Sequence, residues 1–501
     1  MERYLLTVTF RADGSSKFAP SNRWGYFPAA ALGWRMSEEA FLNDVDWLDN
    51  LKLRVSYGEV GNDGINSSLW SQNWEATSDK RYQGAVNGAF LPSYSLGADM
   101  ANKDLKWETT ITRNIGVDFG FFNSRLTGTI DAYWNTTKDL LMKTAIPGIT
   151  GFTSTYANVG QTSNKGIEIA LQGVLVKTRD WNVTAGFNIN FNRGKVDKLA
   201  DNVTGLYGTE WATSSTFPKS DYVLKEGRPV GLVRGLTADG FYTTDDFTYE
   251  NGVYILKEGV ADVSSAVFPN YHLHNGMNER PAGQLAYPGM AKFKDLNDDG
   301  IINDDDVDVI GDMTPVHTGG FNINATYKNF DLGLYFNWSY GNEIYNVNKL
   351  AALYGYKEGA VYENKLSIVK DCYKIYDVVN GELVALTTPE QLNAANANAK
   401  LPLAYSENGY VSTLGIEDGS YLRLNTLTLG YTLPKSMLQK AGISNLRVYG
   451  SIYNVFTITG YSGIDAEVST STSTKTYPQL GMDWGTYPRA RSFVLGVNLS
   501  F

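Results

Sequence analysis

The last nine residues of the chain alternate between apolar side chains and side chains that are mostly small or polar. Side chains of a β-strand point alternately to its two faces, so this period of two predicts a strand with one apolar face. The apolar positions are Phe493, Leu495, Val497, Leu499 and Phe501. Two interpretations stay open at this point: a strand packed on a soluble core, or a strand whose apolar face meets lipid.

The same alternation recurs along the chain and predicts about twelve firm antiparallel strands. The predicted strands span residues 4–10, 24–35, 51–57, 115–121, 126–134, 167–175, 181–191, 321–327, 330–340, 421–433, 445–456 and 489–501. A slip of the pattern between Leu424 and Leu427 indicates a β-bulge. The number rises to fourteen if Val223–Gly235 and Ala291–Asp295 also cross.

The face opposite each apolar stripe is polar. On the strand of residues 181–191 this face and its continuation consist of Asn182, Thr184, Gly186, Asn188, Asn190 and Asn192. A soluble sheet would need other elements to cover its apolar stripes, and the chain holds no helical pattern that could cover so many. The pattern therefore favours an all-β, antiparallel transmembrane β-barrel with a wet interior.

Composition supports a β-rich membrane protein. Aromatic residues make up 13% of the 501 residues and charged residues only 19%. No run of about eighteen apolar residues is present, so no transmembrane helix is predicted. The net charge of -10 argues against nucleic acid as a partner. The single cysteine, Cys372, excludes an intramolecular disulfide.

The lengths of the connections between strands indicate which end of the predicted barrel is extracellular. Counting strands backwards from Phe501 places every long connection on the same side and every short turn on the other. The long segments are residues 60–106, 140–163, 194–317, 341–419 and 457–488. Because outer-membrane barrels have short periplasmic turns and long outside loops, these segments are predicted to be extracellular.

Several motifs follow one another from one end of the chain to the other. They include Arg11–Phe18, Gly25–Pro28, Leu51–Gly58, Asn164–Glu168, Lys294–Gly300, Tyr421–Leu424, Asn445–Tyr449, Asn454–Phe456, Tyr461–Asp465 and the closing strand. In these motifs and in their order the chain resembles one family, the SusC/RagA-type TonB-linked outer-membrane receptors of Bacteroidota. The closing strand resembles the one that the outer-membrane insertion machinery reads in such barrels.

The resemblance implies a particular architecture and function for the complete protein. Family members have a signal peptide, a TonB box and a plug domain before a barrel of twenty-two strands, and the sequence shows none of these segments, so a partial barrel is expected. The complete protein would import oligosaccharides or other large nutrients such as peptides, without enzymatic activity. It would pair with a SusD-like surface lipoprotein and draw energy from the TonB complex through the missing plug. A surface glycan-binding protein without transport and a passive porin are the alternatives.

One acidic loop has the spacing of a calcium site. Oxygen-bearing residues occupy loop positions one, three, five, nine and twelve, a glycine occupies position six, and a backbone carbonyl is available at position seven. The candidate ligands are Asp295, Asn297, Asp299, Ile301, Asn303 and Asp306. Position twelve is Asp where an EF-hand has Glu, and a plain acidic turn is the alternative to a structural Ca²⁺ site.

Aromatic residues of the long loops are candidates for stacking on sugar rings. They are Trp70, Trp74, Tyr82, Tyr94, Trp211, Tyr242, Tyr354, Tyr356 and Trp484. Packing within the loops explains each of them singly at least as well. His272 and His274 alternate in one segment, but no third ligand follows at a defined spacing, and no catalytic motif occurs.

Overall fold

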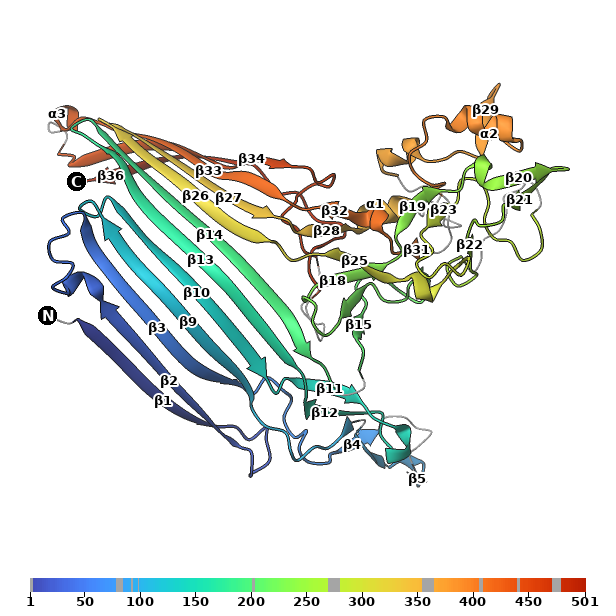
Figure 1. Ribbon diagram of the computed structural model, residues 1–501, viewed down its shortest axis with the longest axis horizontal. Helices are drawn as coiled ribbons and strands as arrows, with labels where there is room; N and C mark the ends of the chain where they lie inside the picture. The colour runs from blue at the N-terminus through green and yellow to red at the C-terminus, as the bar shows by residue number, and fades with distance from the viewer. Residues whose placement is uncertain are drawn as a thin grey trace.

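The protein is built around one twelve-stranded antiparallel sheet (Figure 1). The computed structural model describes residues 3–77, 84–91, 93–97, 99–200, 203–268, 280–353, 365–404, 409–438, 442–470 and 479–501. In spatial order the strands are β1 (Tyr4–Gly14), β2 (Trp24–Arg35), β3 (Leu48–Asn62), β9 (Glu108–Phe121), β10 (Leu126–Lys138), β13 (Gln161–Lys177), β14 (Trp181–Lys198), β26 (His317–Tyr327), β27 (Phe330–Tyr340), β33 (Tyr421–Thr432), β34 (Asn445–Thr459) and β36 (Ser492–Ser500). β1 and β36 form the two edges of this sheet.

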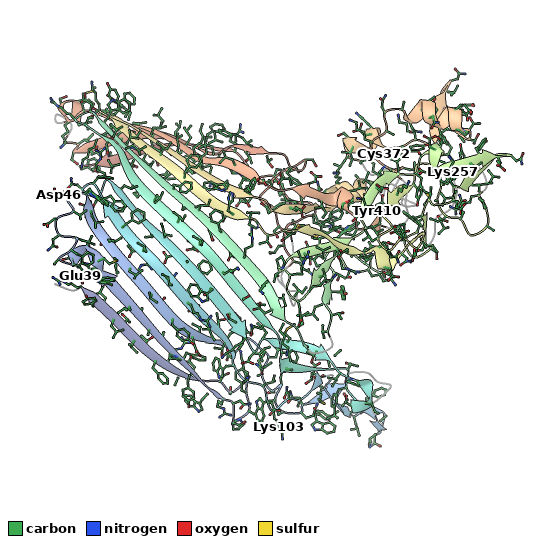
Figure 2. The ribbon with its side chains drawn as sticks, in the orientation of Figure 1. Glu39, Asp46, Lys103, Lys257, Cys372 and Tyr410 are labelled. Atoms are coloured by element: carbon green, nitrogen blue, oxygen red, sulfur yellow. The ribbon has the colours of Figure 1, made fainter. Side chains whose placement is uncertain are left out.

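Sequence neighbours are spatial neighbours throughout the sheet, so short turns and long connections gather at opposite ends. Figure 1 shows both chain ends at one end of the sheet and the long connections at the other. Glu39 and Asp46 lie at the first end and Lys103 at the second (Figure 2). The tightest turn joins β26 to β27 through Lys328 and Asn329, and Lys328 has a φ of 52°. Positive φ values suit two-residue hairpins because they match the twist of the strands.

The apolar stripes lie on an exposed face of the sheet. Tyr4, Leu6 and Val8 of β1 are each exposed by about two thirds, and Leu495 of β36 is 89% exposed. The outward positions of neighbouring strands lie opposite one another, as in the pairs Ile130 with Ile169 and Ile169 with Ile189. A continuous apolar surface of this kind fits a sheet whose outer face meets lipid.

The prediction of twelve firm strands is confirmed, and the extension to fourteen is wrong. Residues 223–235 and 291–295 contribute to β17 (Tyr222–Leu224), β18 (Leu232–Gly235) and β23 (Ala291–Phe293), which belong to small sheets in the β14–β26 connection. These strands have three or four residues and are largely buried on both faces, so they are too short to span a membrane. The predicted bulge is confirmed by a register shift between Leu424 and Thr426.

Three long connections fold together into one body, which we call the loop unit (residues 199–316, 341–420 and 460–491, as far as described). Its strands besides β17, β18 and β23 are β15 (Leu206–Gly208), β16 (Thr216–Phe217), β19 (Ala238–Phe241), β20 (Phe247–Glu250), β21 (Val253–Leu256), β22 (Asp262–Val263), β24 (Ile301–Ile302), β25 (Asp308–Asp312), β28 (Glu343–Asn346), β29 (Tyr376–Val379), β30 (Glu382–Ala385), β31 (Gly409–Tyr410), β32 (Ile416–Asp418) and β35 (Met482–Asp483). Its α-helices, among the described residues, are α1 (Val347–Leu353) and α2 (Pro389–Asn396). Lys257, Cys372 and Tyr410 mark it in Figure 2.

Small elements also fill the remaining connections. At the loop end, β4 (Trp74–Thr77) pairs with β7 (Ser93–Leu96), β5 (Ala85–Val86) pairs with β6 (Ala89–Phe90), and β12 (Ser154–Asn158) joins β11 (Leu141–Ala145) to β8 (Asp99–Met100). At the turn end, α3 (Lys435–Leu438) follows β33. Among the described residues, no helix is both long and apolar enough to cross a membrane.

Buried apolar side chains are concentrated in the loop unit rather than against the sheet. Its largest cluster includes Phe217, Tyr242, Tyr254, Tyr287 and Tyr410, each at most 6% exposed. A second cluster packs α1 against the β14–β26 and β34–β36 connections. The loop unit therefore has a hydrophobic core of its own, whereas the sheet presents its apolar residues outward.

Hydrogen bonds link the three connections of the loop unit to one another. The Tyr222 hydroxyl donates to the carbonyl of Leu480 at 2.8 Å, and the Thr244 hydroxyl lies 2.7 Å from the Asn393 amide oxygen. Arg423 of β33 links the loop unit to the sheet through ion pairs with Asp465 and, at 2.9 Å, with Glu467.

We expect a charged side chain to destabilise the protein more on the outer face of the sheet than on the inner face. Ile169→Arg places a cation on the outer face at the middle of β13 and should destabilise the folded barrel by about 2–4 kcal/mol, as charges at the midplane of barrels do. The matched control is Ala170→Arg, because its side chain enters the polar side. Urea unfolding of the complete protein in lipid vesicles measures both; equal losses would contradict the assignment of faces.

Removing Arg423 should cost more than removing the second arginine of the same cluster. The Arg423 side chain is 3% exposed. Its loss would leave the buried Asp465 carboxylate without this ion pair, so Arg423→Gln is expected to lower the free energy of unfolding by about 3–5 kcal/mol. Arg489 contacts the same two carboxylates but is 48% exposed, so Arg489→Gln should cost about 1 kcal/mol or less. Similar losses in the two variants, measured by thermal unfolding of the complete protein, would contradict this ranking.

Candidate functional site

The inner face of the sheet carries two arginine–aspartate clusters, each built over a glycine. Arg54 of β3 donates to Asp118 at 2.8 Å and to Asp131 at 3.0 Å. Arg54 and Asp131 both lie opposite Gly116 of the strand between them. A Cβ at Gly116 would lie 2.7 Å from the Arg54 guanidinium, so the bridge over β9 requires a glycine there.

The second cluster repeats this arrangement on the other side of the sheet. Arg447 of β34 donates to both carboxylate oxygens of Asp331 on β27, and Gly430 of β33 lies between them. A Cβ at Gly430 would lie 2.6 Å from the Arg447 guanidinium. Both clusters tie three neighbouring strands together and leave charged groups on the wet face.

Amide and hydroxyl groups fill much of the inner face between the clusters. The Tyr133 hydroxyl donates to Asn192 at 2.9 Å, and the Tyr335 hydroxyl donates to Asn324 at 3.0 Å. Near the turn end lies a cavity of about 250 Å³, lined by Asn182, Thr184, Asn324, Ala325, Thr326, Asp331, Leu332, Gly333, Tyr335, Thr428 and Arg447. This surface can exchange hydrogen bonds with a polar solute.

A second polar cavity lies in the loop unit and was missed by the sequence analysis. It has a volume of about 440 Å³, and its lining includes Ser214, Ser215, Thr216, Lys219, Ser220, Arg234, Ser265 and Asp304. Arg234 donates to the Ser220 hydroxyl at 2.8 Å and lies 4.8 Å from the centre of the Tyr207 ring. Burial lowers the pKa of Arg234, and the Asp304 carboxylate is among the groups that oppose this shift. The hydroxyl-rich run of residues 213–216 is the signal that could have indicated it.

Asp221 anchors the segment that leads into the cavity lining. Its carboxylate is fully buried and accepts backbone hydrogen bonds from Glu210, Trp211 and Ala212 at 2.8–3.0 Å. Burial raises the pKa of Asp221, and the three backbone donors partly oppose this shift. The side chain holds the segment before β16 in place and is closed to ligands from solvent.

The predicted loop aromatics that the structure describes lie in different environments. Trp74 and Tyr94 are 67% and 62% exposed on the hairpin of β4 and β7, and Trp484 is 48% exposed. The Trp70 indole donates to the carbonyl of Ser16 at 3.3 Å, and Trp211 packs against the second core cluster. Tyr82, Tyr354 and Tyr356 lie outside the described residues, as do His272 and His274.

Tyr242 requires a correction. Its side chain is fully buried in the largest core cluster, and its hydroxyl donates to the carbonyl of Ala261 at 2.6 Å. The ring therefore packs inside the loop unit and is not available to stack on a ligand. The small and polar residues beside it in the sequence, such as Gly240 and Thr243, do not predict a buried position.

The predicted calcium loop forms a compact turn between β23 and β25. The Asp295 carboxylate accepts from the backbone of Asp299 and Gly300 at 3.3 and 2.7 Å, and the Asn297 amide donates to Asp299 at 3.0 Å. Asp306 is fully buried, and its two oxygens accept from the backbone of Leu296 and Asn303. Within the described ranges, no group of three or more His, Cys, Asp or Glu side chains is arranged to hold a metal ion.

This geometry fits an ion only in part. Asp295, Asn297 and Asp299 are close enough to exchange hydrogen bonds, and each carboxylate oxygen has a second lone pair for a ligand. Asp306 instead closes the loop through backbone contacts, while the Ile301 carbonyl accepts from the Asn303 amide. Calcium therefore stays a prediction.

Comparison with known proteins identifies the family. Residues 1–277 match the TonB dependent receptor-like β-barrel family. The whole chain is 31% identical to TonB-dependent receptor P3 of Formosa agariphila and covers 44% of it. It is also 31% identical to TonB-dependent receptor SusC of Bacteroides thetaiotaomicron, of which it covers 42%. The chain thus spans a little under half the length of these relatives.

Solved structures show the same fold. The whole chain superposes on 46% of a chain of the RagAB peptide importer in its closed-closed state, with a TM-score of 0.73 and 24% sequence identity. The open-open state of that importer matches with a TM-score of 0.71. With the family match, these similarities confirm the resemblance: the chain belongs to the TonB dependent receptor-like β-barrel family, it is similar to SusC over its whole length, and its sheet is part of an outer-membrane β-barrel.

Proposed function

We propose that the complete protein is a TonB-dependent importer of large polar nutrients, either oligosaccharides or peptides. The observation that carries this proposal is the contrast between the two faces of the sheet. An apolar outer face and an inner face of amides, hydroxyls and arginine–aspartate clusters suit a wall between lipid and a water-filled lumen. The relatives described as TonB-dependent receptors support the same role.

The loop unit is the proposed entry to this lumen. It gathers three long connections at one end of the sheet, and that end faces outward if the short turns are periplasmic. Its hydroxyl-rich cavity offers donors and acceptors together with Arg234, which suits a sugar or a peptide carboxylate. We propose this cavity as a first contact for the nutrient.

The proposed partners follow from family membership. A SusD-like surface lipoprotein would cover the loop unit, and the TonB complex would supply energy through a plug domain in the complete protein. Neither role requires catalysis by this chain, and the relatives are named as receptors rather than enzymes.

Loss of the complete gene should abolish growth on the imported nutrient and leave growth on its monomers unchanged. A panel of oligosaccharides and peptides, each as sole carbon or nitrogen source, identifies the nutrient class, and uptake of its fluorescent derivative then measures transport. Because TonB uses the proton gradient, a protonophore should stop uptake. Label that binds at the surface but never enters would support a binding protein, and uptake insensitive to the protonophore would support a passive porin.

A matched pair of variants tests the proposed contact in the loop unit. Arg234→Gln removes the cation that lines the cavity and should lower uptake at limiting nutrient by about tenfold, the loss expected for one charge-assisted hydrogen bond. Lys225→Gln is the control, because Lys225 lies outside this cavity and pairs with exposed Asp308 at 3.7 Å. Equal uptake by both variants would contradict the proposal that this cavity contacts the nutrient.

We also propose that the loop of residues 295–306 binds a structural Ca²⁺. The oxygen spacing and the positive φ of Asp298 and Gly300, 58° and 83°, support this assignment because they turn the loop around one centre. The ligands would be Asp295, Asn297, Asp299, the Ile301 carbonyl, Asn303 and Asp306.

Calcium should stabilise the wild-type protein and not the Asp295→Ala/Asp299→Ala variant. Thermal unfolding of the complete protein with calcium and with a chelator measures this difference. Asp305→Ala is the matched control, since it removes an acidic charge from the same loop without removing a predicted ligand. An identical melting temperature of the wild-type protein in both conditions would favour a plain acidic turn over a calcium site.

A further inference from the structure

The cavity beside Arg234 contains a cation that has no ion pair with any residue that the structure describes. Arg234 of β18 is half-buried, and its side chain donates to a serine hydroxyl rather than to a carboxylate. The two arginines of the inner face differ, since Arg54 and Arg447 both form ion pairs with aspartates. A half-buried cation has lost part of its hydration, so a negatively charged group beside it is stabilising. The cavity is therefore suited to an anionic ligand.

The contacts of Arg234 leave part of its guanidinium for such a ligand. One nitrogen donates to the Ser220 hydroxyl at 2.8 Å, and the guanidinium carbon lies over the Tyr207 ring, 4.8 Å from its centre. Across the described ranges this side chain forms no second hydrogen bond. A guanidinium has five N–H donors in one plane, and an edge with two donors matches the two oxygens of a carboxylate. Arg234 can thus bind a carboxylate without giving up either contact.

The charges around the cavity favour a ligand with a single negative charge. Lys219 and Arg234 are the cations of the lining and Asp304 is its one carboxylate, so one positive charge is in excess. Lys219 is exposed and, like Arg234, forms no ion pair within the described part of the chain. A carboxylate carries one negative charge, whereas a phosphate monoester carries about −1.5 to −2 at neutral pH. The charge balance therefore favours a carboxylate over a phosphate group.

Hydroxyl groups and apolar side chains complete the lining. Ser214, Ser215 and Ser265 are exposed, so the cavity opens to solvent among hydroxyl groups. Phe217 and Val267 belong to the largest core cluster and form an apolar part of the lining. The volume of about 440 Å³ lies within the range of small-molecule sites, about 300–1,000 Å³. The cavity therefore suits one terminal unit of a large nutrient.

We propose that this cavity binds a carboxylate at the end of the imported nutrient, so that the protein prefers nutrients with a free carboxylate. Arg234 donates to both carboxylate oxygens, Lys219 adds a second positive charge, and the serine hydroxyls bind neighbouring polar groups. This preference rests on the proposed import function and adds to it the charge of the nutrient. The C-terminus of a peptide and a uronic acid of an oligosaccharide both supply a carboxylate of this kind.

Paired probes that differ only in the carboxylate test the preference and its source. One pair is a pool of tetrapeptides without acidic residues and the same pool as C-terminal amides. The other pair is a mixture of uronic acid oligosaccharides and their methyl esters. Native mass spectrometry of the complete protein in detergent measures binding, and in at least one pair the free acid should bind about tenfold more tightly than its blocked form.

The pair that shows the preference identifies the source of the carboxylate. A preference in both pairs would support recognition of the carboxylate itself. Equal binding of free and blocked forms in both pairs, or no binding of either free acid, would overturn the proposal.

Three variants locate the preference in the cavity. Arg234→Gln should weaken binding of the free acid by about tenfold and leave binding of the blocked form unchanged. Arg234→Lys keeps the charge but loses the two-donor edge, so its affinity should lie between those of the wild-type protein and Arg234→Gln. Lys225→Gln is the control and should keep the full preference, because Lys225 lies outside the lining and pairs with exposed Asp308. An unchanged preference in folded Arg234→Gln would overturn the site.

Lys219→Gln provides a test that does not depend on a half-buried residue. Lys219 is exposed, so its replacement leaves the core intact and should weaken binding of the free acid by about twofold to fivefold. Heat-modifiable migration in electrophoresis reports whether each variant is folded. If Arg234→Gln does not fold, an unchanged preference in Lys219→Gln would overturn the site.

Uptake by cells separates the carboxylate preference from the proposed import function. Equal uptake of the free and the blocked nutrient would contradict the preference, while import by this protein would stand. Binding of the free acid that depends on Arg234 but is followed by no uptake would contradict import, while the carboxylate site would stand.

Discussion

Inside a lipid layer a peptide group has no water to bond with, so each backbone amide must find its partner within the protein. The twelve-stranded sheet meets this demand by pairing every internal strand on both sides. The requirement also explains where side chains go. With the backbone paired laterally, one face is free to be apolar against lipid and the other to be polar against water, as the exposed stripes of β1 and β36 illustrate.

The same lateral pairing constrains the inner face. An arginine and an aspartate on strands that flank a third strand can meet only if the residue between them has no side chain. Gly116 and Gly430 meet this condition at two places far apart in the sequence. Charges on the inner face thus add cross-strand contacts to the backbone ladder, and they do so where water keeps the cost of holding them low.

The sheet could be predicted from the sequence because its signal is local. A period of two over seven or more residues marks each strand, and the regular exchange of short and long connections marks the two ends. The slip at Leu424 even located a bulge. The loop unit could not be predicted in this way. Its strands of two to five residues are set by contacts between connections hundreds of residues apart, such as Tyr222 with Leu480. For the same reason the sequence predicted Tyr242 as a surface aromatic. The cavity around Arg234 is assembled from four separate segments, and only its run of hydroxyl residues could have indicated it.

Arg423 belongs to the wall of the barrel and forms ion pairs with two carboxylates of the loop unit. These ion pairs connect the loop unit to the wall. The second core cluster contains residues of all three connections, so a displacement of one connection affects the others, and Arg423 links them to β33. If a partner docks on the loops, as proposed above, a displacement of one connection would therefore reach the wall at Arg423, near the start of β33.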